Sequence, residues 1–170
     1  HTNSRTPVET PRVSCWIRDV HEEGIEPHPG PAVYSKNIDG LNERFNHTMW
    51  RIAQSHSNKK MWAFLLQEHH LTKAKAKDKN VYQIAKQHNL LYIQSDMPNS
   101  DVKGGTAIVI PLDMIETFPG ESDEAARRRV ENSTYRRADG RMVSVTTLVN
   151  GAPITFTSIY APVNPTDRPA

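Results

Sequence analysis

Three polar segments of the chain carry side chains that could bind a metal ion or a phosphate, and each follows an apolar run. The segments are Asn37-Ile-Asp39-Gly-Leu41, Gln67-Glu68 and Tyr160-Ala-Pro162-Val-Asn164. In α/β folds, ligands bind beyond the carboxyl ends of the core strands. The order and the common placement of the three segments therefore favour one shared site.

Glu68 is the predicted metal ligand. It directly follows the compact apolar run 61–67, and a hard cation such as Mg²⁺ takes one or two carboxylates and keeps several waters. His69 and His70 come next and could indicate a transition-metal site. Adjacent side chains point in different directions, however, and no third imidazole has ligand spacing. We interpret both histidines as flanking residues.

The other two segments each have a structural interpretation that stays open. Asn, Asp and Gly favour turns for backbone reasons, so Asn37 and Asp39 could serve only a turn. Proline ends a strand, so Tyr160 could be packed there for structural reasons. In the functional interpretation, the Tyr160 hydroxyl and the Asn164 amide bind a phosphate oxygen.

The elements that must position these side chains alternate along the chain. Apolar runs predict strands at 33–37, 61–67, 90–93, 106–110, 142–149 and 154–160, and helical periodicity predicts helices through 45–53 and 81–88. Asn150-Gly151 predicts a hairpin between the last two strands. The charged segment 116–134 is interpreted as a loop or a short exposed helix. This order of elements favours an α/β sandwich with mixed sheets.

Composition excludes several classes of protein. The chain has 170 residues, 36% hydrophobic and 24% charged, which is enough for one domain with a core. No apolar run is long enough to cross a bilayer. The single cysteine, Cys15, excludes an intramolecular disulfide framework and a cysteine-cage zinc site. A net charge of +2 excludes a strongly basic nucleic-acid binder.

Positive charge is nevertheless concentrated in two segments. Seven lysines lie between positions 59 and 86, and six arginines lie between positions 127 and 141. Clusters of this kind attract phosphate backbones. A solvated surface without a partner is the alternative interpretation.

Five ordered segments resemble the endonuclease/exonuclease/phosphatase superfamily, and in particular the apurinic/apyrimidinic-type endonuclease domain of non-LTR (LINE-type) retrotransposons. The segments are Asn37–Asn42, Phe64–Leu71, Gly104–Ile110, Asp139–Val143 and Ile159–Pro162, and the resemblance covers about residues 33–165. It implies a DNase I-like fold, a four-layered α/β sandwich of mixed sheets. Residues 32–170 would be the N-terminal portion of such a domain, which is C-terminally incomplete.

The resemblance also implies roles for single residues. Asn37 matches the Asn that positions the catalytic groups, Asp39 matches an acidic position near the metal, and Glu68 matches the metal-binding Glu. Tyr160 matches the Tyr that contacts the scissile phosphate. Asn164 matches the Asn of a Tyr-x-Pro-Asn pattern, with one residue inserted. The implied cofactor is Mg²⁺, with Mn²⁺ as the alternative.

The implied activity is a phosphodiesterase that nicks target DNA for retrotransposon integration. It would act in the nucleus, without a membrane partner, and a reverse transcriptase domain would follow in the same polyprotein. The superfamily's Gly-Asp-x-Asn and Ser-Asp-His blocks do not occur before Ala170, and the second supplies the base that activates water. We therefore expect a fragment that is inactive alone. A phosphoesterase acting on a small or lipid phosphate and a non-catalytic truncated remnant are the alternatives.

Residues 1–31 carry five of the 12 prolines and almost no periodic apolar pattern, which predicts a disordered leader. Within this leader, Gly24–Pro31 resembles the ribosome-skipping peptides that end Asn-Pro-Gly-Pro, with His28 in place of the Asn. A Pro-rich linker is the alternative interpretation. Because the chain begins with His1, we expect it to be a part of a longer open reading frame.

Overall fold

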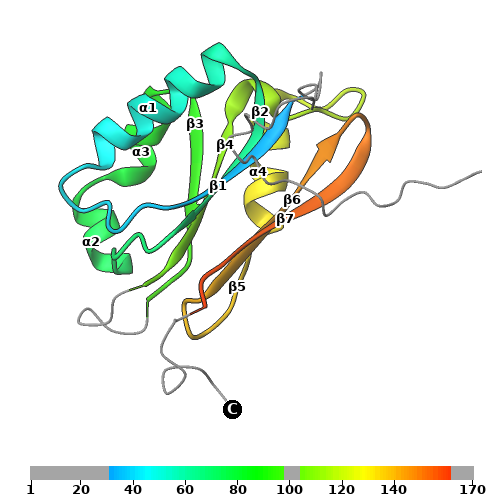
Figure 1. The fold of residues 1–170 in the computed structure, drawn as a ribbon. Helices are drawn as coiled ribbons and strands as arrows, with labels where there is room; N and C mark the ends of the chain where they lie inside the picture. The colour runs from blue at the N-terminus through cyan, green and yellow to red at the C-terminus, as the bar shows by residue number, and fades with distance from the viewer. Residues whose placement is uncertain (1–30, 98–103, 162–170) are drawn as a thin grey trace, which may run out of the picture.

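Two β-sheets pack face to face in the structure, a computed structural model that describes residues 31–97 and 104–161 (Figure 1). The first sheet has four strands in the order β1-β2-β4-β3. They are β1 (Ala32–Asn37), β2 (Met61–Gln67), β3 (Leu90–Gln94) and β4 (Thr106–Pro111). β1 runs parallel to β2, whereas β4 is antiparallel to both of its neighbours, so the sheet is mixed.

The second sheet is antiparallel, with the strand order β5-β6-β7. Its strands are β5 (Tyr135–Arg136), β6 (Met142–Val149) and β7 (Ala152–Ile159). Asn150 and Gly151 join β6 to β7 with φ angles of 53° and 82°, the positive values that a tight two-residue hairpin requires. The predicted hairpin is confirmed, and β7 begins two residues before the predicted 154–160.

Three helices cover the outer face of the first sheet (Figure 1): α1 (Phe45–Asn58), α2 (Lys73–Asp78) and α3 (Val81–Gln87). Met49 of α1 and Val81 of α3 are fully buried in one cluster with Phe64 of β2. The Phe45 ring meets the Tyr92 ring of β3 edge-on, with 4.9 Å between the ring centroids. The apolar stripes predicted through 45–53 and 81–88 therefore face the sheet.

α2 was not predicted from the sequence. Its alternation of lysine and alanine shows no helical apolar stripe, and only Ala76 is buried. The helix begins where the Thr72 hydroxyl accepts a hydrogen bond from the Lys75 N–H at 3.2 Å, a favourable N-cap. A capping signal and one buried alanine are thus all that the local sequence offers for this helix.

α4 (Asp123–Asn132) confirms the short-helix interpretation of segment 116–134 over the loop interpretation, but one face of the helix is buried. It is a helix of 10 residues that buries Ala126 and Val130 completely. Ser122 caps it by accepting the Ala125 N–H at 3.1 Å, and two acidic residues occupy its first turn. These signals are present in the sequence, but two apolar positions among the arginines give too weak a stripe to predict burial.

A second core fills the space between the two sheets. It consists of Ala63, Ile93, Ile108 and Ile110 from the first sheet, Val143 and Val145 from β6, and Val130 from α4. Phe156 of β7 packs against the same cluster. α4 lies along β6, where the Ser133 hydroxyl accepts the Thr146 N–H at 2.8 Å. α4 therefore helps to close the core between the sheets.

The described residues form a layer of helices, a four-stranded sheet and a three-stranded sheet, and the predicted α/β class with mixed sheets is confirmed. A short 3₁₀ turn, η1 (Leu112–Met114), follows β4. Within residues 31–97 and 104–161, no helix covers the outer face of the second sheet, where Ile159 is 59% exposed. These residues do not form a fourth layer.

Two further sequence predictions concern membrane spans and the N-terminal leader. None of the described helices combines the length and the apolar character needed to cross a membrane. Residues 1–30 of the predicted leader lie outside the described residues, and with them all of the skipping-like peptide except Pro31.

Candidate metal centre

The loops that follow β1 and β2 lie side by side because the two strands are parallel neighbours. Asn37, the last residue of β1, pairs with Gln67, the last residue of β2. The pairing continues beyond the strands, since the Gly40 N–H donates to the Glu68 carbonyl at 2.7 Å and the Leu41 N–H donates to the His69 carbonyl at 3.0 Å. The first and second predicted segments therefore meet at one edge of the sheet.

The loop after β1 is held by a turn and by one arginine. The Asn37 side-chain oxygen accepts the Asp39 N–H at 3.0 Å, which is the local bond that asparagine makes in turns. Arg44 donates from Nη2 to the carbonyl groups of residues 38, 39 and 40, at 3.1, 3.0 and 3.0 Å. The structure thus shows the turn interpretation of Asn37, and the same turn fixes the backbone that carries Asp39.

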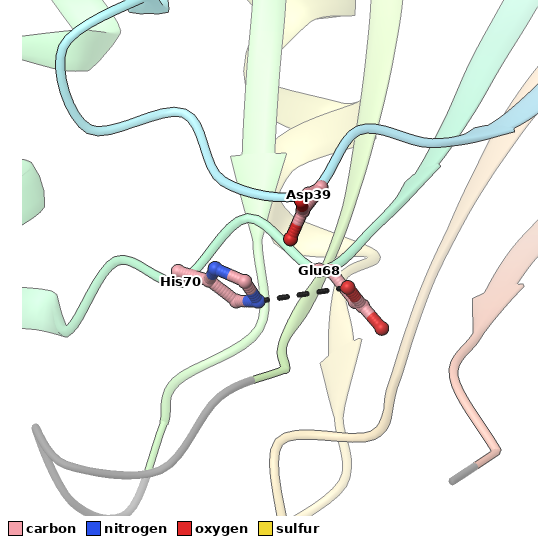
Figure 2. Close-up of side chains that lie close together, drawn as sticks. All are labelled: Asp39, Glu68 and His70. Atoms are coloured by element: carbon pink, nitrogen blue, oxygen red, sulfur yellow. Dashed lines mark ion pairs between the residues drawn. The ribbon is translucent and has the colours of Figure 1, made fainter. Parts of the chain in front are cut away.

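The loop after β2 has an unusual backbone. Glu68 and His70 have φ angles of 63° and 55°, a left-handed conformation that costs a non-glycine residue about 1–2 kcal/mol. Hydrogen bonds compensate for this cost: the Glu68 N–H donates to the Gly105 carbonyl at 2.7 Å, and the His70 N–H donates to the Gly104 carbonyl at 2.9 Å. Both side chains therefore emerge on the same side of the loop (Figure 2).

Asp39, Glu68 and His70 form one cluster at this edge (Figure 2). One possible ligand atom from each lies within 4.8 Å of the others. His70 Nε2 lies 3.7 Å from a carboxylate oxygen of Glu68, which is too long for a hydrogen bond. In residues 31–97 and 104–161 this is the single group of three or more potential metal ligands with such spacing.

The chemistry of this donor set fits a divalent cation. Asp39 and Glu68 offer carboxylate oxygens, the ligands that Mg²⁺ prefers. His70 Nε2 is buried and has no hydrogen-bond partner in the part of the chain that the structure describes. An imidazole nitrogen is a common ligand of transition-metal ions, so Mn²⁺ fits all three donors and Mg²⁺ fits the two carboxylates.

The position of His70 corrects the interpretation of both histidines as flanking residues. The sequence argument that adjacent side chains point in different directions is right, because His69 turns inward and is 0% exposed. Because successive side chains alternate in direction, His70 points to the same side as Glu68. A spacing of two residues, Glu68 to His70, was the signal that could have found it.

His69 is an uncharged residue of the interior. Burial lowers the pKa of His69 to about 4, against a smaller opposing effect of its hydrogen bond to the Ser95 carbonyl. The ring is therefore neutral at physiological pH. It adds no positive charge behind the two carboxylates of the cluster.

Tyr160 follows β7 and lies beside the same loops. Its N–H donates to the Arg141 carbonyl at 2.9 Å. Its ring lies against Gly104, where an added Cβ would be 3.3 Å from the ring. Gly104, whose carbonyl accepts the His70 N–H, thus also contacts Tyr160. Asn164 lies outside the described residues.

Hydrogen bonds between polar side chains join the two sheets next to the cluster. The Gln67 amide donates to the Ser158 hydroxyl at 3.2 Å, and that hydroxyl donates to the Leu66 carbonyl at 2.9 Å. Gln67 precedes Glu68, and Ser158 lies two residues before Tyr160. These hydrogen bonds therefore fix the two strand ends from which these side chains project.

The two basic segments differ in how much of their charge is free. Arg127 pairs with Glu124 at 2.7 Å and Arg129 pairs with Glu121 at 2.8 Å. In contrast, the exposed side chains of Lys73, Lys75 and Lys77 on α2 have no ion-pair partner among the described residues. Unpaired positive charge therefore lies on α2, which starts three residues after His70.

Comparisons with known proteins give a distant structural likeness. No protein-family model matches the chain, and no curated protein matches it. An AP endonuclease from Leishmania major has a similar structure, with a TM-score of 0.48 and 13% identity over 87% of this chain and 45% of that chain. An endonuclease/exonuclease/phosphatase family protein from Leptotrichia buccalis has a TM-score of 0.40 and 15% identity over 75% of this chain and 52% of that chain.

The chain spans about half the length of both solved structures. The likeness concerns the course of the chain.

Proposed function

We propose that this chain is the metal-binding part of a Mg²⁺- or Mn²⁺-dependent phosphodiesterase that nicks DNA. The observation that carries the proposal is the cluster of Asp39, Glu68 and His70 at the ends of two parallel strands. It lies beside a tyrosine from the opposite sheet and three residues before a lysine-rich helix. A phosphate ester is the substrate class that matches an acidic cation site next to free lysines.

Asp39 and Glu68 would hold the cation, and His70 would add a third donor for Mn²⁺. When bound, the cation would polarise a phosphoryl oxygen and stabilise the charge of the leaving oxygen. Asn37 acts on Asp39 through the turn that its side chain closes. Tyr160, and Asn164 beyond the described residues, would bind and orient the scissile phosphate.

The lysines of α2 would hold the DNA strand next to the cluster. Lys73, Lys75 and Lys77 are exposed, and their charges would contact flanking phosphates without reading sequence. Arg127 and Arg129 of α4 are poor alternatives because each is paired with a glutamate. Three lysine ammonium groups on one short helix, unpaired among the described residues, favour a nucleic-acid strand over a small phosphate ester, since only a strand presents several phosphates at once.

We further propose the biological setting implied by the sequence segments. The chain would be the N-terminal portion of the endonuclease domain of a non-LTR retrotransposon. It would act in the nucleus and be followed by a reverse transcriptase domain in the same polyprotein. The base that activates water would come from residues beyond Ala170, so residues 1–170 would bind the cation without cutting DNA.

A plasmid-nicking assay with Mg²⁺ tests this function. It compares residues 1–170, a chain that continues beyond Ala170 in the same reading frame, and the longer chain with Glu68→Gln. We expect the longer chain alone to convert supercoiled plasmid to the nicked form. Asp113→Asn is the matched control, because Asp113 is also a carboxylate beside a histidine but lies near the start of β2.

Each of the other outcomes favours a different function. Release of phosphate from a small or lipid ester, without nicking, would favour a phosphoesterase. Folded chains that bind no Mn²⁺ and show neither activity would favour a non-catalytic remnant. Nicking by the Glu68→Gln chain would contradict the assignment of the cation site.

A further inference from the structure

We propose that His69 and Ser95 are a pair of positioning residues that hold Glu68 and His70 in their metal-binding arrangement and connect the cluster to the turn between β5 and β6, which binds the Tyr160 backbone. The inference rests on the proposed function, because it takes the cluster as a cation site. It assigns a role to two buried residues that contact neither the cation site nor a substrate.

The hydrogen bonds of His69 fix one tautomer and one orientation of its ring. Nδ1 accepts the Leu71 N–H at 2.9 Å, so it carries no proton. Nε2 therefore carries the proton and donates to the Ser95 carbonyl at 3.2 Å. Both ring nitrogens are used, and the side chain is fully buried. The backbone on either side of His69 cannot rotate without breaking one of these bonds.

The neighbours of His69 are the residues of the cation site. Glu68 and His70 hold their left-handed backbone on either side of it. If the His69 ring left its pocket, the loop could relax to an ordinary conformation, and Glu68 and His70 would no longer face the same side. The inward direction of the His69 side chain thus sets the outward direction of Glu68 and His70.

Gly105 shows how closely the ring is packed. A Cβ at Gly105 would overlap the His69 ring, and the φ angle of Gly105 is +88°. The carbonyl of the same glycine accepts the Glu68 N–H at 2.7 Å. The His69 ring, the Gly105 backbone and the Glu68 backbone are therefore locked together as one unit.

Ser95 continues this unit toward the second sheet. Its hydroxyl accepts the Thr106 N–H at 2.9 Å and donates to the Gly140 carbonyl at 2.8 Å. Gly140 precedes Arg141, whose carbonyl accepts the Tyr160 N–H at 2.9 Å. A continuous path of short contacts thus runs from the Glu68 loop, through His69 and Ser95, to the backbone of Tyr160.

The affinity of residues 1–170 for Mn²⁺, measured by titration calorimetry and by the Mn²⁺ EPR signal, tests this role without any need for activity. His69→Asn is the main variant: its side-chain oxygen can still accept the Leu71 N–H, but it is too short to reach Ser95. His69→Gln is the conservative variant, because its longer amide can donate to the Ser95 carbonyl. Ser95→Ala removes the hydroxyl that joins the two sheets.

His56 provides a matched control in the same chain. It is buried, its Nδ1 accepts the Met61 N–H at 3.0 Å, and its Nε2 lies 2.8 Å from an oxygen of Asp113. Met61 begins β2 and Gln67 ends it, so His56 lies at the opposite end of the strand from Glu68. His56→Asn removes a comparable set of bonds without touching the cluster.

Outer-sphere partners of metal ligands commonly contribute 10–100-fold to metal affinity. We expect His69→Asn to weaken Mn²⁺ binding at least about tenfold, with His69→Gln within about threefold of the unchanged chain and His56→Asn unchanged. Ser95→Ala is expected to weaken binding by a smaller factor and to add little in the His69→Asn background, because both variants break the same path.

Three results would overturn the inference. Equal Mn²⁺ affinity of His69→Asn and the unchanged chain, with both folded by circular dichroism, would show that the ring does not position the ligands. Equal weakening by His69→Asn and His56→Asn would show general loosening of the fold. If His69→Asn does not fold, unchanged affinity and an unchanged EPR signal in Ser95→Ala would reject the pair. Absence of Mn²⁺ binding by the unchanged chain would instead refute the proposed cation site, and the inference with it.

Discussion

A buried histidine lies beside each end of β2, His56 from α1 and His69 from the loop after the strand, and the two have the same hydrogen-bond pattern in different surroundings. His56 accepts the first N–H of β2, from Met61, and His69 accepts the Leu71 N–H just after the strand. The second ring nitrogen of His56 faces Asp113, which is 45% exposed and also bonds Lys60 at 3.3 Å. The second ring nitrogen of His69 faces a backbone carbonyl in the interior.

The two histidines differ in whether they bind a carboxylate, and this difference decides which carboxylates stay available for a cation. At the His56 end, a carboxylate is bonded to His56 and Lys60: burial raises the pKa of Asp113, but its interactions with these two residues outweigh this effect and lower it. At the His69 end, the supporting ring is neutral and sealed from solvent. The carboxylates of Asp39 and Glu68 are thereby left for a cation rather than for the histidine behind them.

The largest expected effect comes from filling the space beside His69. Gly105→Ala would place a methyl group into the ring and force a positive φ on alanine, so we expect the free energy of unfolding to fall by about 3 kcal/mol or more. Gly151, in the hairpin between β6 and β7, has a φ angle of +82°, but a Cβ added there would meet no atom within 4 Å. We expect Gly151→Ala to lose only about 1 kcal/mol.

Urea unfolding curves of the two glycine variants measure this difference. The Gly151→Ala curve serves as the control for backbone strain alone. Equal losses in both variants would mean that the His69 ring moves aside freely, and the description of the site end as tightly packed would be wrong.

The next largest effect concerns pH. Because burial lowers the pKa of His69 to about 4 from 6.5, the unfolded chain takes up a proton in this range that the folded chain does not bind. The free energy of unfolding therefore falls as the pH drops from 6.5 toward 4, and this contribution is complete above 6.5. Between about pH 7.5 and about pH 5 we expect a loss of about 2 kcal/mol due to His69.

Chemical denaturation of the unchanged chain and of His69→Gln at both pH values, without added metal, isolates this contribution. All other side chains are common to both chains. The difference in slope between them therefore belongs to His69. Parallel pH dependences would show that the ring is protonated as easily in the folded chain as in the unfolded chain.

A smaller effect is expected for DNA binding, and it extends the comparison to the charged surfaces. Replacing Lys73, Lys75 and Lys77 by Gln should weaken binding to duplex DNA by about tenfold and flatten its salt dependence, because each phosphate contact releases counterions. Replacing Arg127 and Arg129 by Gln should change DNA affinity little, since both are already paired with glutamates. Fluorescence anisotropy at several salt concentrations measures both effects, and a stronger loss from the arginine variant would contradict the assignment.

The sequence could predict the part of the fold and of the site that depends on local pattern. The apolar run 61–67 coincides with β2 as the structure has it. Glu68 follows as the first residue beyond the strand. Asn150-Gly151 specifies its hairpin by backbone conformation alone. In each case, a few consecutive residues contain all the information that the element needs.

The rest depends on contacts between distant parts of the chain. His70 reaches the cluster because its backbone is bonded to Gly104, and nothing in the residues around it encodes that bond. The inward turn of His69 likewise depends on space left by Gly105 and on an acceptor from Ser95. α4 is buried through Val130, whose partners lie on both sheets. The local apolar pattern does not identify partners that are distant in the sequence, so these contacts could not be predicted from the sequence.

The smallest expected effect sharpens the comparison at the His56 end. Asp113→Asn removes a half-exposed ion pair, which contributes about 0.5 kcal/mol, and Mn²⁺ affinity should stay unchanged because the pair lies near the start of β2. The paired state requires an ionised Asp113, so its contribution is present above the ordinary carboxyl pKa of 3.8 and is lost as the pH falls through the lowered pKa. Urea unfolding at neutral and acid pH measures this loss. A fall in Mn²⁺ affinity in Asp113→Asn would show that the two ends of β2 are coupled along the strand, and that the cation site depends on more of the sheet than the His69 unit.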